Sequence, residues 1–342
     1  MTRAAYRASA ESALMRAHPW LIPAAAGLIT VVTALAVTNR AHAGPDVHSS
    51  STESESVRRV AEKANPDVYG AATDDRAADA MYAVGEAFDA GLGVRSDAQQ
   101  AFDWYMRAAA LGHAEAMNRL GVLYAEGRGV SRDYSAALGW YRRAAAYGSS
   151  SALSNLATMY FYGFGVPQSY PKAVQLLQIA VRGGAADAQN KLGALYNDGL
   201  GVVKDQQRAL ELFRQAAMQG YPPAMVNLGR MYIEAIAVPR DVVRGYALIR
   251  AAVDAGIPAS LQELALRELG TGAGRLNAEQ LARAQALASS SLCGIDQRAV
   301  GESAGIRRDR CRIDLAGPHD VQHLESLREQ VVADDATMAT PP

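Results

Sequence analysis

Two short motifs contain residue types that could perform catalysis or bind a metal. Ser169 and Lys172 have the S-x-x-K spacing at which a lysine can activate a serine nucleophile. The Ser-Asp-Asn and Lys-Thr-Gly motifs that accompany it in such enzymes do not follow, and a helix cap explains Ser169 better. His319 and His323 stand one helical turn apart, as a zinc pair requires, but no third ligand is nearby, and an exposed helix start explains them better. We therefore predict no catalytic residue, no metal site and no cofactor.

Cys293 and Cys311 are the only cysteines of the chain. In an oxidising compartment they can form a disulfide across their 18-residue separation. We predict this disulfide, and the alternative is two buried free thiols. It would clip the residues between the cysteines against the last helices. A short helix near 321–332 and a tail would complete a C-terminal appendage over residues 293–342.

The N-terminal region has the features of an export signal. A basic segment, residues 1–20, precedes an uncharged apolar run over residues 21–38, an order that keeps the N-terminus in the cytoplasm and sends the remainder across the membrane. Ala41-His42-Ala43 would suit a signal peptidase, whereas a run of about 18 residues can span a bilayer. We favour an inner-membrane anchor with the remainder in the periplasm, and the alternative is a periplasmic or secreted protein cleaved near Ala43. Residues 39–73 are polar and predict a flexible linker.

The overall composition favours a helical fold and argues against nucleic acid as a partner. The chain carries 34 basic and 35 acidic residues, a net charge of −1, so it has no global positive field that would attract nucleic acid. Alanine is abundant and only 13 residues are proline, which favours closely packed helices and argues against a large all-β domain.

The strongest signal is a repeat of 36 residues in the middle of the chain. One small position recurs as Gly85, Gly121, Ala157, Gly193 and Gly229. A turn position recurs as Gly91, Gly127, Gly163, Gly199 and then Ala235, and a capping position recurs as Asp97, Asp133, Ser169, Asp205 and Asp241. A sixth unit continues in register but lacks the glycine and aromatic positions, as terminal repeats do.

These positions predict a helical hairpin in each repeat. The first helix, about Ala80–Ala90 in the first unit, ends at a glycine that adopts a left-handed backbone, and Asp or Ser caps the second helix. Residues such as Trp104 and Phe88 are expected to fill the space between the two helices. In the fifth unit Ala235 and Ala237 replace both turn glycines, so its turn should be stiffer or shaped differently. In the sixth unit Asn277 and Gln280 predict a capping box.

The pattern A-x-x-x-L-G-x-x-Y-x-x-G-x-G-V-x-x-D, which continues to W-Y-x-x-A-A-x-x-G, resembles the Sel1-like repeat family. It is seen from Ala116 to Gly148. The family is related to the tetratricopeptide repeats, and the resemblance implies an all-α, right-handed α-solenoid that scaffolds protein complexes. We expect the solenoid over residues 74–292, as five repeats and a degenerate sixth. Bacterial members are often exported and act as adaptors.

Partner recognition should fall to first-helix positions that vary between repeats. If first helices line a concave face, as in tetratricopeptide relatives, amide and cationic side chains there could bind a peptide backbone or a carboxylate. The candidates are Asn118, Arg119, Asn155, Asn190, Lys191, Asn227 and Arg230. The alternative is that these side chains are merely solvated.

Together these features predict a non-enzymatic scaffold or adaptor of the bacterial cell envelope. Its partner would be a protein or peptide, and not a nucleic acid, while the N-terminal run would attach it to the membrane if uncleaved. The alternative function is a peptidoglycan-related or other envelope accessory enzyme or binding factor.

Overall fold

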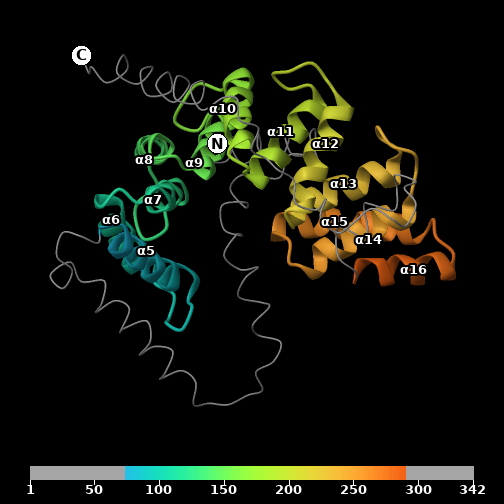
Figure 1. Cartoon of the computed structure of the whole chain (residues 1–342), viewed down its shortest axis with the longest axis horizontal. Coiled ribbons are helices and arrows are strands. Elements are labelled where there is room, and N and C mark those ends of the chain that lie inside the picture. The colour runs from blue at the N-terminus through green and yellow to red at the C-terminus, as the bar shows by residue number, and fades with distance from the viewer. Residues whose placement is uncertain (1–73, 290–342) are drawn as a thin grey trace, which may run out of the picture. The chain divides into compact units, whose positions relative to one another are not determined.

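The structure is a computed structural model that describes residues 74–289 of the 342-residue chain. All regular elements in this range are α-helices, twelve in number, with no strand among them. The helices divide into two compact units, whose described parts are residues 74–169 and 170–289 (Figure 1). The predicted apolar run, linker, disulfide and C-terminal helix lie outside the described residues.

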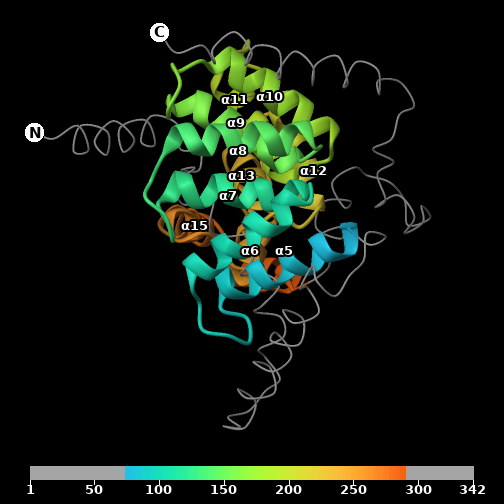
Figure 2. The same ribbon diagram turned by 90° about the vertical axis from the view of Figure 1, so that its left-hand side faces the viewer.

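The N-terminal unit (residues 74–169) contains five helices that pack in chain order. They are α5 (Asp74–Ala90), α6 (Ala98–Ala110), α7 (Ala114–Glu126), α8 (Tyr134–Ala146) and α9 (Ser150–Tyr162). α5 pairs with α6 and α7 pairs with α8, while α7 also packs on α6 and α9 on α8. Figure 2 shows α6, α7, α8 and α9 stacked one above another. One hairpin cannot bury its apolar side alone, so the stacking supplies the core.

The C-terminal unit (residues 170–289) continues the same pattern and adds a different end. Its helices are α10 (Tyr170–Arg182), α11 (Ala186–Asp198), α12 (Gln206–Met218), α13 (Pro222–Glu234), α14 (Val242–Asp254), α15 (Ala259–Ala273) and α16 (Ala278–Ala288). α11 pairs with α12 and α13 with α14, and both α15 and α16 pack on α14. The predicted capping box between Asn277 and Gln280 is confirmed at the start of α16.

The turns between first and second helices repeat one geometry. The N–H of each capping residue donates to the carbonyl of the residue nine positions earlier, as from Asp97 to Phe88 at 2.9 Å. Asp97, Asp133, Asp205 and Asp241 accept hydrogen bonds from first-turn amides, so these four predicted caps are confirmed.

The fifth turn keeps this geometry without its glycines. Ala235 has φ 60° and ψ 41°, close to the φ 71° and ψ 38° of Gly127 in the second turn, and Ala237 also has a positive φ of 57°. Of the two alternatives for this turn, a different shape is therefore wrong, because the surrounding hairpin imposes the left-handed conformation on alanine at an energetic cost. The alternative of a stiffer turn stays a prediction.

The small position of each repeat lets the two helices of a hairpin approach each other. A Cβ atom added at Gly85 would lie 2.6 Å from the ring of Tyr105, and one at Gly121 would lie 2.5 Å from the ring of Tyr141. Both tyrosines are buried. The space was expected to hold Trp104, but that tryptophan is only half-buried and stacks instead under Arg107 at 4.6 Å.

None of the helices in residues 74–289 combines the length and apolar character needed to cross a bilayer.

Candidate functional site

The predicted partner-binding residues lie on first helices, and two of them bridge adjacent repeats in the N-terminal unit. Asn155 of α9 donates from Nδ2 to Oδ1 of Asn118 on α7 at 2.9 Å. Asn118 in turn donates to Glu115 at 2.8 Å, and Glu115 accepts from Ser149 at 3.0 Å. Asn118 is buried and Asn155 half-buried. The structure therefore shows these two amides joining α7 to α9.

An equivalent bridge occurs in the C-terminal unit. Asn227 of α13 donates from Nδ2 to Oδ1 of Asn190 on α11, also at 2.9 Å, and both side chains are buried. Lys191 on the same helix lies 3.3 Å from Asp187 and is partly exposed. The four bridging asparagines thus form two pairs, one in each unit.

The two bridges recur at a spacing of two repeats. Asn190 follows Asn118 by 72 residues, and Asn227 follows Asn155 by the same number. The acidic and basic neighbours recur at the same spacing. Glu115, Asn118 and Arg119 in the second repeat correspond to Asp187, Asn190 and Lys191 in the fourth. Polar first-helix positions therefore alternate between repeats although packing positions do not.

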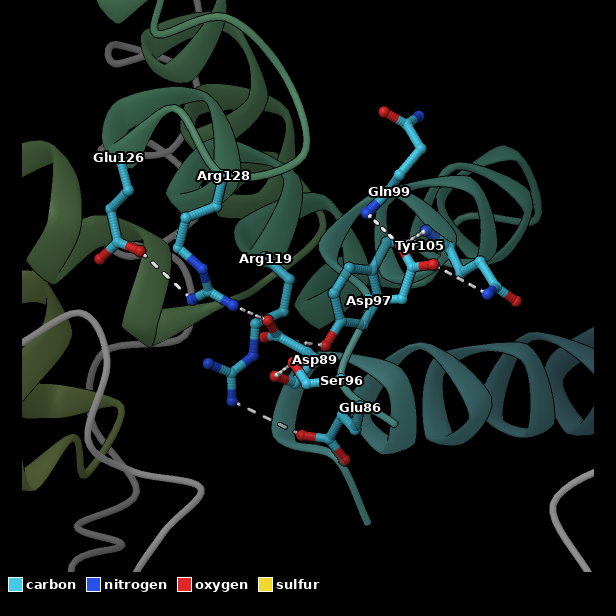
Figure 3. Close-up of polar contacts among 10 residues, drawn as sticks. Glu86, Asp89, Ser96, Asp97, Gln99, Tyr105, Arg119, Glu126 and Arg128 are labelled. Carbon is cyan, nitrogen blue, oxygen red and sulfur yellow. Dashed lines mark hydrogen bonds and ion pairs between the residues drawn. The ribbon is translucent and has the colours of Figure 1, made fainter. Parts of the chain in front are cut away.

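Arg119 is the centre of a polar cluster between α5 and α7 in the N-terminal unit (Figure 3). Its Nη2 atom lies 3.5 Å from Glu86 Oε1, which also accepts a hydrogen bond of 2.7 Å from Tyr82. Burial acts to lower the pKa of Arg119, but its neighbours Tyr82, Tyr105 and Glu115 raise it above the ordinary value. Burial likewise raises the pKa of Tyr82. Arg119 therefore stays charged while only 13% of its side chain is exposed.

Arg128, in the turn after α7, extends this cluster to a second pair of carboxylates. Its guanidinium is paired with Asp89 at the end of α5 and lies 3.3 Å from Glu126 Oε2 (Figure 3). Tyr105 donates to the other Asp89 oxygen at 3.5 Å. Two arginines thus face three carboxylates across the first two repeats. These charge pairs fix the position of one repeat relative to the other.

Glu126 is the member of this cluster with the least favourable surroundings. Burial raises its pKa, and Arg128 only partly opposes that effect. Its Oε1 atom and the buried hydroxyl of Tyr141 have no hydrogen-bond partner among the described residues. A carboxyl group in this situation costs stability when it is ionised.

We expect this cost to appear as a pH dependence of stability. Because its folded-state pKa is raised, Glu126 contributes more stability at low pH, and this contribution is lost as pH rises through the folded-state pKa. Glu126→Gln cannot ionise, so the variant should gain stability relative to the wild type as pH rises from 4 to 7. Urea unfolding of both proteins across this range measures the difference. A constant difference would contradict the assigned cause.

Arg230 of α13, another predicted binding residue, is almost fully buried in the C-terminal unit. It lies 3.5 Å from Glu268 on α15 and 3.8 Å from Glu234, and burial lowers its pKa. The carboxylates that hold Arg119 and Arg230 were not identified from the sequence. A possible signal was the occurrence of opposite charges 33 residues apart, at Glu86 and Arg119, on neighbouring first helices.

The described residues contain a shallow pocket but no cluster suited to a metal. The pocket, of about 580 Å³, lies at the start of α12 and includes none of the seven predicted residues. It is lined by Tyr196, Val202, Val203, Lys204, Asp205, Gln206, Gln207 and Ala237. No three His, Cys, Asp or Glu side chains between residues 74 and 289 could share a metal ion. His319 and His323 lie outside this range.

Comparison with known proteins gives the repeats a family. A profile described as the Sel1 repeat matches residues 78–113, 114–149, 150–184, 186–221 and 222–257, more than half of the chain. A search of curated proteins found no match.

The solved structures that share the fold include the following two. One is c5321, a protective antigen of uropathogenic Escherichia coli strains that displays an SLR fold, with 26% identity and a TM-score of 0.55 over 74% of this chain. The chain spans 52% of that protein. The other is a Sel1 repeat protein from Oxalobacter formigenes, with 26% identity and a TM-score of 0.52, over 70% of this chain and 97% of that one.

Proposed function

Because this chain belongs to the Sel1 repeat family, whose members are generally protein-interaction scaffolds, we propose that it is a non-catalytic scaffold that binds a partner protein or peptide. The observation that carries this proposal is the run of five matched repeats, whose recurring positions form caps, turns and helix contacts. Only the variable first-helix positions are left to distinguish one partner from another.

The exposure of the candidate residues divides their roles. Arg119, Asn155 and Lys191 keep part of their side chains at the surface, whereas Asn118, Asn190, Asn227 and Arg230 are buried. In our proposal these three partly exposed side chains contact an acidic or backbone group of the partner through the atoms that remain at the surface. The buried members hold them in position, as Asn118 does through its bond to Asn155.

The proposed setting is the bacterial cell envelope. It is supported by the sequence of residues 1–43, from which we propose an inner-membrane anchor or an export signal ahead of a periplasmic, right-handed solenoid. In that compartment Cys293 and Cys311 would form the disulfide that we predict.

A crosslinking experiment tests the proposed function. The full chain would be expressed in the bacterial envelope, crosslinked and purified, with partners identified by mass spectrometry. Arg119→Gln combined with Lys191→Gln should reduce the yield of a specific partner by about tenfold or more, because charge-assisted contacts contribute about 1.5–3 kcal/mol each. Arg143→Gln, an exposed arginine on the second helix α8, is the matched control and should leave the yield unchanged.

Two outcomes would contradict the proposal. Equal capture by the double variant and the wild type would remove the first-helix surface as the binding site. Retention of the purified chain on peptidoglycan, without any crosslinked protein, would favour the alternative of a cell-wall accessory factor. Circular dichroism of each variant would show that lost capture does not result from unfolding.

A further inference from the structure

The first turn of α7 is capped by a histidine. Nδ1 of His113 accepts a hydrogen bond from the Ala116 N–H at 3.0 Å. The other side-chain caps that the structure describes are aspartate, serine or asparagine. Ser149 holds the same position one repeat later, where its Oγ accepts from the Ala152 N–H at 3.1 Å. His113 is therefore the one titratable imidazole among these described caps.

The opposite edge of the His113 ring faces α5. Nε2 lies 3.3 Å from Oδ1 of Asp79, and the ring stacks on Tyr82 with centroids 4.5 Å apart and an interplanar angle of 17°. An imidazole that accepts at Nδ1 must carry its hydrogen on Nε2, where it can donate to Asp79. In its neutral form His113 thus contacts α7 through one nitrogen and α5 through the other.

Protonation removes only one of these contacts. In the imidazolium ion both ring nitrogens carry hydrogen, so Nδ1 can no longer accept from the Ala116 N–H and instead faces it with a second donor. The positive charge also lies at the positive end of the α7 dipole. The contact with Asp79, by contrast, becomes a charge pair.

The other charged and titratable groups around His113 do not replace the lost acceptor. On α5, Tyr82 is already bonded to Glu86. On α7, Glu115 follows the cap but is engaged by Asn118 and Ser149. From the end of α8, the ring of Tyr147 packs beside Gly112, the residue before His113.

We propose that His113 is a protonation-dependent cap: the neutral ring holds the start of α7, and the imidazolium releases it while remaining paired with Asp79. The first turn of α7 therefore responds to mild acid, and the candidate binding residues Asn118 and Arg119 lie in the turn that follows it. This device depends on the described contacts alone and does not require that the proposed scaffold function be correct.

Hydrogen exchange of the full chain, resolved to single amides and corrected for the intrinsic effect of pH, tests the proposal. Between pH 7.5 and 5.5 the protection of the Ala116 amide should fall about fivefold, the size of one lost cap. The Ala152 amide, capped by Ser149, serves as an internal control and should not change. In His113→Ser and His113→Asn, which cap without titrating, the Ala116 amide should lose its pH dependence.

Two results would overturn the assignment. One is equal behaviour of Ala116 and Ala152 in the wild type across this pH range. The other is a pH response of Ala116 that persists in either variant. Two substitutions are made because one of them can fail to fold. Circular dichroism shows which variant is folded, and the hydrogen exchange of that variant is compared with the wild type.

Discussion

Replacing Glu268 with glutamine is expected to lower the free energy of unfolding of the C-terminal unit by about 3 kcal/mol. Glu268 and Arg230 have side chains that are only 10% and 6% exposed, with Oε1 and Nε 3.5 Å apart. Removing the carboxylate charge leaves a guanidinium in a poorly hydrated place. Glu234, at 3.8 Å, is 38% exposed, so solvent weakens its compensation. Urea unfolding followed by circular dichroism measures the loss, and hydrogen exchange of α13 and α15 assigns it to this unit.

Two further variants separate burial from the mere presence of a charge pair. Glu234→Gln removes the more exposed carboxylate and should change the free energy of unfolding by less than about 1 kcal/mol. The double variant Arg230→Met with Glu268→Leu removes both charges and should recover most of the loss, since apolar groups can replace a buried pair. Equal losses in Glu268→Gln and Glu234→Gln would show that the buried pair has no special weight.

Replacing Gly201 with alanine is expected to destabilise the C-terminal unit by about 3 kcal/mol. Gly201 has a φ of +72°, and a Cβ atom there would lie 2.6 Å from the carbonyl carbon of Tyr170 at the start of α10. The left-handed conformation costs alanine about 1 kcal/mol or more, and the overlap with backbone adds about 1–3 kcal/mol because backbone cannot rotate away. The same urea unfolding experiment measures the effect.

The chain contains its own control one repeat later. Ala237 occupies the corresponding position with a φ of 57°. Ala237→Gly should raise the free energy of unfolding by up to about 1 kcal/mol, because relief of the left-handed conformation exceeds the added entropy of the unfolded chain. A loss of stability in this variant, or a negligible loss in Gly201→Ala, would contradict the explanation from backbone geometry.

The sequence predicts the repeat, the hairpins and the caps because their causes are local. Asp97 caps the start of a helix through its own side chain, and Gly91 ends a helix through its own backbone conformation. These features need only neighbouring residues and a fixed period. α5 begins at Asp74, six residues before the predicted start at Ala80, because the repeat period does not define where the first helix of the array begins.

The polar surface could not be predicted in the same way because it depends on contacts between repeats. Nothing near Asn118 in the sequence indicates that Asn155 would bond to it. Likewise, the sequence around Arg119 predicts a solvated side chain, and only the fold shows that Glu86 lies beside it. The prediction of a different shape for the fifth turn failed for the opposite reason. Alanine by itself disfavours the left-handed conformation, but packing imposes this conformation on Ala235.

The paired asparagines also define what counts as one module in this protein. Each bridge needs a side-chain carbonyl oxygen that accepts, from one hairpin, and an amide nitrogen that donates, from the following hairpin, so a single hairpin carries only half of it. A shortened or lengthened version would preserve the pairing of these asparagines if it lost or gained 72 residues, whereas loss of the single repeat that carries Asn155 would place Asn118 beside a repeat with Lys191 at the equivalent position. The repeating unit defined by these bridges is therefore a pair of adjacent hairpins.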